Sequence, residues 1–221
     1  MAKRVTMAVA LLAAACASVG CPLLNLMVDP EMTVPAKYDV EGKRVLILPM
    51  AEGEDGTFFD SDLGYNLAGL LAVSLRNQMA AQDEEVTVLP VDDVAARVKS
   101  GVVKHDEFVF MGEQTDADVV MAGRILEYRL KEPRIQGKLG TIKIAMDVYD
   151  VDKGAIVYSD TFTHRYPVQG ELGTPELDPY MSEEIFRERF MNYASRVIAW
   201  RFFDLRIMRT KYHYWQSQAQ R

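Results

Sequence analysis

The chain has 221 residues, of which 49% are hydrophobic and 26% are charged, and its formal net charge is −7. This composition is ordinary for a globular protein with one domain and short appendages. A net-acidic chain lacks the basic face that phosphate contacts require, which argues against nucleic acid as a partner.

The first twenty residues have the layout of a secretory signal. Lys3 and Arg4 give a positive start, residues 5–15 are apolar except for Thr6, and small residues lead to Cys21. An apolar stretch of this length is too short for a stable membrane span. We therefore expect residues 1–20 to be a signal peptide. Its removal changes the net charge from −7 to −9.

The segment Ser18-Val19-Gly20-Cys21 resembles the lipobox of bacterial lipoproteins, with Ser18 where leucine is usual. The resemblance implies cleavage before Cys21 and acylation of that cysteine. Acyl chains would anchor the protein, because each buried methylene contributes about 0.8 kcal/mol. Pro22, where a retention signal would have aspartate, implies by resemblance the periplasmic face of the outer membrane.

Cysteine usage agrees with a lipid anchor. Both cysteines, Cys16 and Cys21, lie in or directly after the signal, so no structural disulfide is expected in the folded part. Three alternatives stay open: cleavage before Cys16, an ordinary cleaved signal, and an uncleaved anchor.

The residues after the signal begin with a tether. Residues 21–42 comprise the acylated cysteine and a segment with three prolines and Gly42, which we expect to hold the folded part near the membrane. Residues 43–50 (KRVLILPM) predict a buried strand, and the polar residues 51–62 predict a loop. A helix capped by Ser61 or Asp62 follows, with an apolar stripe of Leu63, Leu67, Leu70, Leu71 and Leu75.

The middle of the chain predicts further strands and helices. Residues 86–90 (VTVLP) indicate a second strand, residues 91–99 a small helix, and residues 100–115 another helix. Residues 117–130 predict a long strand in which Gly123 marks a bulge.

The clearest hairpin signal lies in residues 141–166. Residues 141–151 alternate, with one face made of Ile142, Ile144, Met146 and Val148. Residues 152–154 predict a turn, and residues 155–166 the partner strand. The order strand–helix–strand–helix followed by three strands predicts the α/β class (an α+β mixed sheet) with helices against one face.

The C-terminal part begins with a linker, residues 167–181, which contains three prolines. Residues 182–221 comprise an amphipathic helix capped by Ser182 and a basic, aromatic tail from Leu205 onward. The apolar stripe of this helix, which we expect to pack on the sheet, consists of Phe186, Phe190, Tyr193, Val197 and Trp200.

Residues 43–166 together resemble one family group. The pieces are the VLILP strand, the VTVLPVDDV and ADVVMAGRI segments, and the hairpin DVYDVDKGAIVYSDT. They resemble the TolB amino-terminal-like domains, which include the curli-secretion (CsgG-like) and penicillin-binding-protein activator lipoproteins. The resemblance implies a docking or assembly module of the envelope without enzymatic activity. The connection 132–140 is too short for the hairpins of a pore, so only the scaffold carries over.

The sequence shows no catalytic, metal or cofactor motif. The three histidines are far apart, and no zinc-type pair, serine nucleophile elbow or phosphate loop is present. The acidic residues between Glu52 and Asp62 lack the ligand order of a calcium loop. Asp147 and Asp150 read as surface and turn residues rather than an acid–base pair. We therefore expect no enzyme and no cofactor.

The tail supplies the candidate contact residues. Aromatic and basic side chains in this mixture favour lipid headgroups or a partner groove, against the alternative of a frayed terminus. The residues concerned are Arg209, Lys211, Tyr212, Tyr214 and Trp215.

The expected function is that of a non-enzymatic envelope lipoprotein, held at the membrane through Cys21. It would dock or assemble an envelope protein partner or further copies of itself. The alternative is an accessory lipoprotein that regulates a membrane-bound enzyme or transporter.

Overall fold

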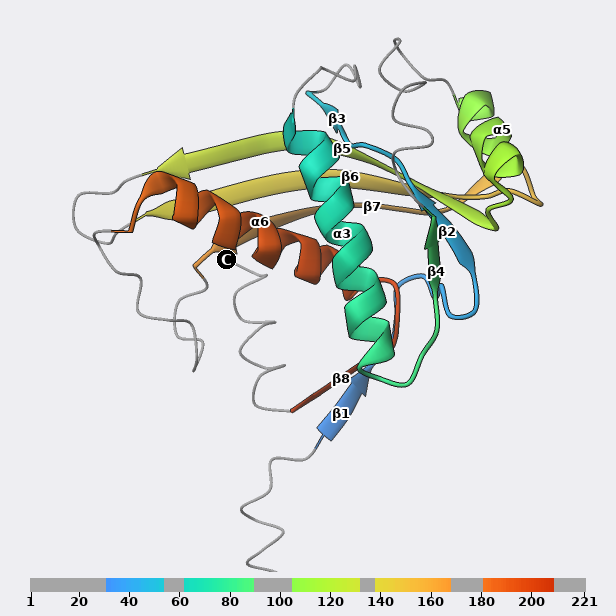
Figure 1. Ribbon diagram of the computed structural model, residues 1–221, viewed down its shortest axis with the longest axis horizontal. Helices are drawn as coiled ribbons and strands as arrows, with labels where there is room; N and C mark the ends of the chain where they lie inside the picture. The colour runs from blue at the N-terminus through green and yellow to red at the C-terminus, as the bar shows by residue number, and fades with distance from the viewer. Residues whose placement is uncertain (1–30, 54–61, 90–104, 132–137, 168–180, 209–221) are drawn as a thin grey trace, which may run out of the picture.

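The computed structural model describes residues 31–53, 62–89, 105–131, 138–167 and 181–208. A six-stranded mixed sheet has the order β4-β2-β5-β6-β7, with β3 beside β5, and a separate two-stranded ribbon pairs β1 with β8 (Figure 1). The elements are β1 (Glu31–Val34), β2 (Arg44–Ile47), β3 (Ala51–Glu52), α3 (Asp62–Ala80), β4 (Thr87–Leu89), α5 (His105–Thr115), β5 (Val119–Lys131), β6 (Leu139–Asp150), β7 (Ala155–Tyr166), α6 (Glu183–Ala199) and β8 (Leu205–Met208).

The sheet has a parallel part and an antiparallel part. Strand β2 pairs in parallel with β4 and β5, whereas β5, β6 and β7 form an antiparallel meander. The alternation predicted for β6 is confirmed, because Ile142, Ile144, Met146 and Val148 are each at most 1% exposed. The predicted turn is also present, with Gly154 at a φ of +60°. The fold is therefore the mixed α/β arrangement that the sequence predicts.

Helices α3 and α6 cover one face of this sheet (Figure 1). The leucine stripe of α3 is confirmed, because Leu67, Leu71 and Leu75 are fully buried. On α6, Ser182 is the N-cap, and its Oγ accepts a hydrogen bond from the backbone N–H of Ile185 at 3.3 Å. The predicted aromatic stripe of α6 is buried against the sheet, with Trp200 at its half-buried end.

Helix α5 packs on the opposite face, so the expectation that the helices share one face was wrong. Neighbouring residues of a strand point to opposite faces. Val45 and Ile47 of β2 therefore join the core under α3, while Leu46 packs with Met111 of α5 and with Val120. Both faces of β2 are apolar, which is the pattern of a strand buried on both sides.

Gly123 does not mark a bulge. It pairs in register with Met146, and the irregularity of β5 lies between Ile125 and Glu127. A Cβ at position 123 would come within 3.0 Å of Cγ of Met50. The glycine therefore provides space for a core methionine rather than an extra residue in the strand.

The tether expected up to residue 42 is wrong for its second half. Residues 31–34 form β1, which pairs antiparallel with β8, and Val40 is fully buried. The backbone N–H groups of Lys37 and Tyr38 both donate to the carbonyl of Arg201. The prolines at 30 and 35 flank the short strand instead of interrupting it. The folded part therefore includes residues 31–42, and the segment from Leu205 to Met208 belongs to it as well.

Several predicted segments cannot be compared with the structure, because they lie outside the described residues. These are the signal peptide and the tether up to residue 30, the loop residues 54–61, the small helix at 91–99, the linker residues 168–180 and the tail from residue 209.

Two glycines of α3 should respond in opposite ways to alanine. A Cβ at Gly64 would lie 1.9 Å from the carbonyl oxygen of Met50, whereas nothing lies within 4 Å of a Cβ at Gly69. Gly69→Ala should raise the free energy of unfolding by about 0.5–1 kcal/mol through helix propensity. Gly64→Ala should lower it by about 1–3 kcal/mol, because backbone atoms must move apart. Urea denaturation measures both, and equal effects would contradict the described packing.

Candidate functional site

Helices α3 and α6 meet through small polar residues. The hydroxyl groups of Ser74 and Ser195 are hydrogen-bonded at 2.9 Å, and Ser195 also donates to the carbonyl of Asn192 at 3.0 Å. Ser195 is fully buried, so its hydroxyl group needs these partners. Short side chains at this contact let the two helices approach closely and fix their crossing.

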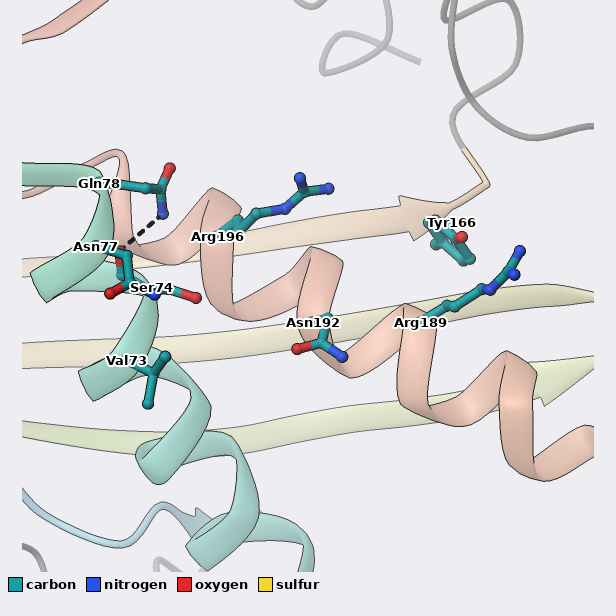
Figure 2. A pocket seen from close by; sticks show the side chains of 8 residues that line it. All are labelled: Val73, Ser74, Asn77, Gln78, Tyr166, Arg189, Asn192 and Arg196. Atoms are coloured by element: carbon teal, nitrogen blue, oxygen red, sulfur yellow. Dashed lines mark hydrogen bonds between the residues drawn. The ribbon is translucent and has the colours of Figure 1, made fainter. Parts of the chain in front are cut away.

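A groove of about 460 Å³ opens beside this contact (Figure 2). Its walls come from the second half of α3 and from the flank of α6, and the end of β7 closes it. The lining residues are Val73, Ser74, Asn77, Gln78, Tyr166, Arg189, Asn192 and Arg196.

The spacing on α6 explains why three polar residues share the groove. Arg189, Asn192 and Arg196 recur at steps of three and four, which places them on one flank of a helix. All three are exposed, whereas Phe190 and Tyr193 between them are buried on the sheet. The same helix therefore uses one face for the core and the adjoining flank for the groove.

The groove is locally basic in an acidic protein. None of the lining residues that the structure describes is acidic, and neither Arg189 nor Arg196 forms an ion pair with a described residue. Other arginines of this region are paired: Arg187 lies 3.2 Å from Glu183, and Arg201 lies 2.5 Å from Asp160. The two groove arginines are thus available to an external anion.

One end of the groove is lined by Tyr166, whose ring packs against other aromatic rings of the core. Tyr166 is 7% exposed, and its ring lies 5.2 Å from that of Tyr193 and 5.6 Å from that of Phe186, measured between ring centres. This packing holds the end of β7 against α6. The groove wall is therefore supported by the core rather than by a loop.

His164 of β7 is a half-buried residue that packs at the edge of the core. Its ring packs between Phe162, at 5.4 Å, and Tyr193, at 6.4 Å, and its Nε2 is buried without a hydrogen-bond partner. Burial, with a smaller contribution from Arg201, lowers the pKa of His164 to about 4. A neutral imidazole in this surrounding is a packing residue.

The carboxylates weighed as a catalytic pair have structural partners. Asp147 accepts a hydrogen bond from the Ser159 hydroxyl at 2.6 Å, and Asp150 accepts one from the backbone N–H of Lys153 at 3.0 Å. The Lys153 ammonium group lowers the pKa of Asp150. Both carboxylates are therefore surface or turn residues, as expected. Within the described ranges, no three histidine, cysteine or carboxylate side chains gather as metal ligands.

The contact residues predicted from the sequence lie outside the described residues. These are Cys21, Arg209, Lys211, Tyr212, Tyr214 and Trp215. The structure does show where both segments leave the fold. Glu31 pairs with Met208, so the chain that comes from Cys21 and the chain that continues into the tail meet the ribbon side by side.

The sequence reasoning missed the groove. One signal was available on α6, where exposed Arg189, Asn192 and Arg196 follow a helical spacing. The α3 wall gave no comparable signal, because Asn77 and Gln78 are ordinary residues for an exposed helix. The groove exists only through the packing of two helices that are distant in sequence.

None of the helices in the described part of the chain is long and apolar enough to cross a membrane.

No protein-family model and no curated protein matches the sequence. Several solved structures show a weak likeness. The PelC dodecamer from Paraburkholderia phytofirmans is 19% identical, with 62% of this chain and 80% of that chain covered and a TM-score of 0.37. Lipoprotein GNA1162 from Neisseria meningitidis is 14% identical, with 70% and 97% covered and a TM-score of 0.39.

The LpoB C-terminal domain from Escherichia coli is 11% identical, with 57% of this chain and 84% of that chain covered and a TM-score of 0.37. Likenesses at this level carry no argument about what the present chain does.

The burial of His164 predicts a dependence of stability on pH. The unfolded chain binds a proton at this residue near pH 6.5, but the folded chain does so only near pH 4. Neutral His164 therefore makes its full contribution to the free energy of unfolding above pH 6.5. This contribution, on the order of 3 kcal/mol, is lost as the pH falls toward 4.

Replacing His164 with a side chain that does not titrate should remove this pH-dependent part of the unfolding free energy. His164→Gln should show a smaller loss of unfolding free energy between pH 7.5 and pH 4.5 than the unmodified chain, measured by urea denaturation at each pH. Identical pH profiles would show that His164 is not buried as described.

Proposed function

We propose that this chain is a non-enzymatic lipoprotein, anchored through Cys21 to the periplasmic face of the outer membrane, and that its folded part docks an envelope protein. The observation that carries the proposal is the antiparallel pairing of β1 with β8. This pairing brings together the segment that follows the lipid anchor and the start of the basic, aromatic tail.

The length of the connection supports a position close to the membrane. Nine residues lie between Cys21 and Glu31, so the chain takes ten steps from one to the other. Even a fully extended chain spans at most about 3.6 Å per residue, or roughly 36 Å in all. The ribbon would therefore be the part of the fold nearest to the lipid surface.

The tail adds a second contact at the same place. It leaves the fold at Met208, beside Glu31, and carries Arg209, Lys211, Tyr212, Tyr214 and Trp215. Aromatic and basic side chains suit the interface between lipid and water. A second contact near the acylated cysteine would add to the attachment and orient the fold on the membrane.

A regulator of a membrane-bound enzyme or transporter is the second candidate. The short tether favours it over a long-range role, because a partner must then lie in or next to the same membrane. Docking to further copies of the chain would instead produce a large assembly.

The anchor is tested by two cysteine variants of the full chain. Cys21→Ala should move the protein from the membrane fraction to the soluble fraction, because acylation supplies most of the attachment. Cys16→Ala should leave the distribution unchanged, since that residue would be removed with the signal. Membrane binding that survives Cys21→Ala and is lost in Cys16→Ala would contradict the assignment.

Gentle detergent extraction of the unmodified chain, followed by sizing, then separates the two kinds of docking. A large homo-oligomer would support assembly of the chain with itself. One membrane enzyme that co-purifies in fixed stoichiometry would support the regulator.

A further inference from the structure

We propose that the groove between α3 and α6 binds an extended acidic segment of a partner protein, with Arg189 and Arg196 each pairing with one carboxylate of that segment. This inference names the class of partner and rests on the docking role proposed above. It concerns residues of α3, α6 and β7, and the lipid anchor at Cys21 is not among them.

The charge of the occupant follows from the lining. Two arginines line the groove without an ion-pair partner among the described residues, and none of the described lining residues is acidic. In Figure 2 both guanidinium groups extend away from the axis of α6 on the same side. Arginine pairs with carboxylates through two parallel hydrogen bonds, so an anionic occupant is favoured.

The shape favours a peptide over a lipid surface. A membrane is flat on this scale and fits a convex or level patch of protein. Here the arginines border a recess that also contains the amide side chains of Asn77, Gln78 and Asn192. Amide groups both donate and accept hydrogen bonds, as a peptide backbone requires. Exposed Val73, at 46%, adds a small apolar contact for a side chain.

The spacing of the arginines predicts the spacing of the carboxylates. Arg189 and Arg196 are seven residues apart on α6, which corresponds to a rise of about 10.5 Å at 1.5 Å per residue. A segment in the polyproline II conformation has three residues per turn and rises about 3.1 Å per residue. Its residues i and i+3 therefore lie on one side, about 9.3 Å apart. An acidic residue at every third position would match the two arginines.

The groove is also close to the ribbon. Gln78 lines the groove, and Gln82, one helical turn later in sequence, accepts a hydrogen bond from the backbone N–H of Arg206 in β8 at 2.8 Å. A segment bound in the groove would therefore lie near the end of the fold that carries the anchor.

The test uses three labelled peptides and the full chain in a neutral detergent, with fluorescence anisotropy as the readout. The first peptide repeats Glu-Pro-Pro four times and presents an acidic residue at every third position. The second repeats Gln-Pro-Pro and is neutral. The third has the composition of the first, with its glutamates grouped at one end. Only the first peptide should bind well.

Two double variants distinguish the effect of the groove arginines from the effect of a lower positive charge on the same two helices. Arg189→Gln with Arg196→Gln should weaken binding of the Glu-Pro-Pro peptide about tenfold, the size expected from two partly exposed charge pairs. Arg76→Gln with Arg187→Gln removes the same charge from the same two helices outside the groove lining, and should leave the affinity nearly unchanged.

Four results would overturn the proposal. The first is no binding of the Glu-Pro-Pro peptide, and the second is equal binding of the grouped peptide. The third is equal weakening by both double variants. The fourth is binding of phosphatidylglycerol vesicles, instead of the peptide, through Arg189 and Arg196. A failure here leaves the result of Cys21→Ala unaffected, so the groove and the anchor are judged separately.

Discussion

The backbone contact between residues 31–40 and residues 201–208 holds together the parts of this protein that its function would use. Strand β1 pairs with β8, the carbonyl of Arg201 accepts two N–H groups from the N-terminal segment, and the N–H of Ala36 donates to Asp204 at 2.9 Å. The backbone groups of these largely half-buried and exposed residues are paired with one another, so breaking the bonds would cost free energy. The contact also reaches α3, because Gln82 accepts the N–H of Arg206. Residues 31–40, residues 201–208 and the end of α3 are thereby joined through one contact.

Helix α6 contributes both to the core and to the groove. The inner face of α6 closes the core against β6 and β7, while its flank supplies the two arginines of the groove. The core face of α6 is buried, so the helix backbone that carries the two arginines is held against the sheet. The hydrogen bond between half-buried Ser74 and buried Ser195 joins α3 and α6 beside the groove.

Local patterns predicted the elements whose signals lie within one segment. The alternation around Ile144 and the leucine stripe around Leu71 each report which face is buried, and both are confirmed. The ribbon could not be predicted in this way, because Glu31 meets Met208 across almost the whole chain and neither strand has a distinctive local pattern. Gly123 was misread for a related reason, since its neighbour Met50 is distant in sequence. The groove required the packing of two helices, which no single helix pattern contains.

The contact between the two ends is most directly tested by a disulfide across the ribbon. Thr33 and Arg206 are paired in register, and the chain has no other cysteine after position 21. Thr33→Cys with Arg206→Cys should therefore form an intramolecular disulfide in an oxidising compartment, because paired strand residues lie within about 5.5 Å. Thr33→Cys with Ile207→Cys places the second thiol on the opposite face and should form little. Equal yields in the two variants, or disulfides only between molecules, would contradict the pairing on which the account depends.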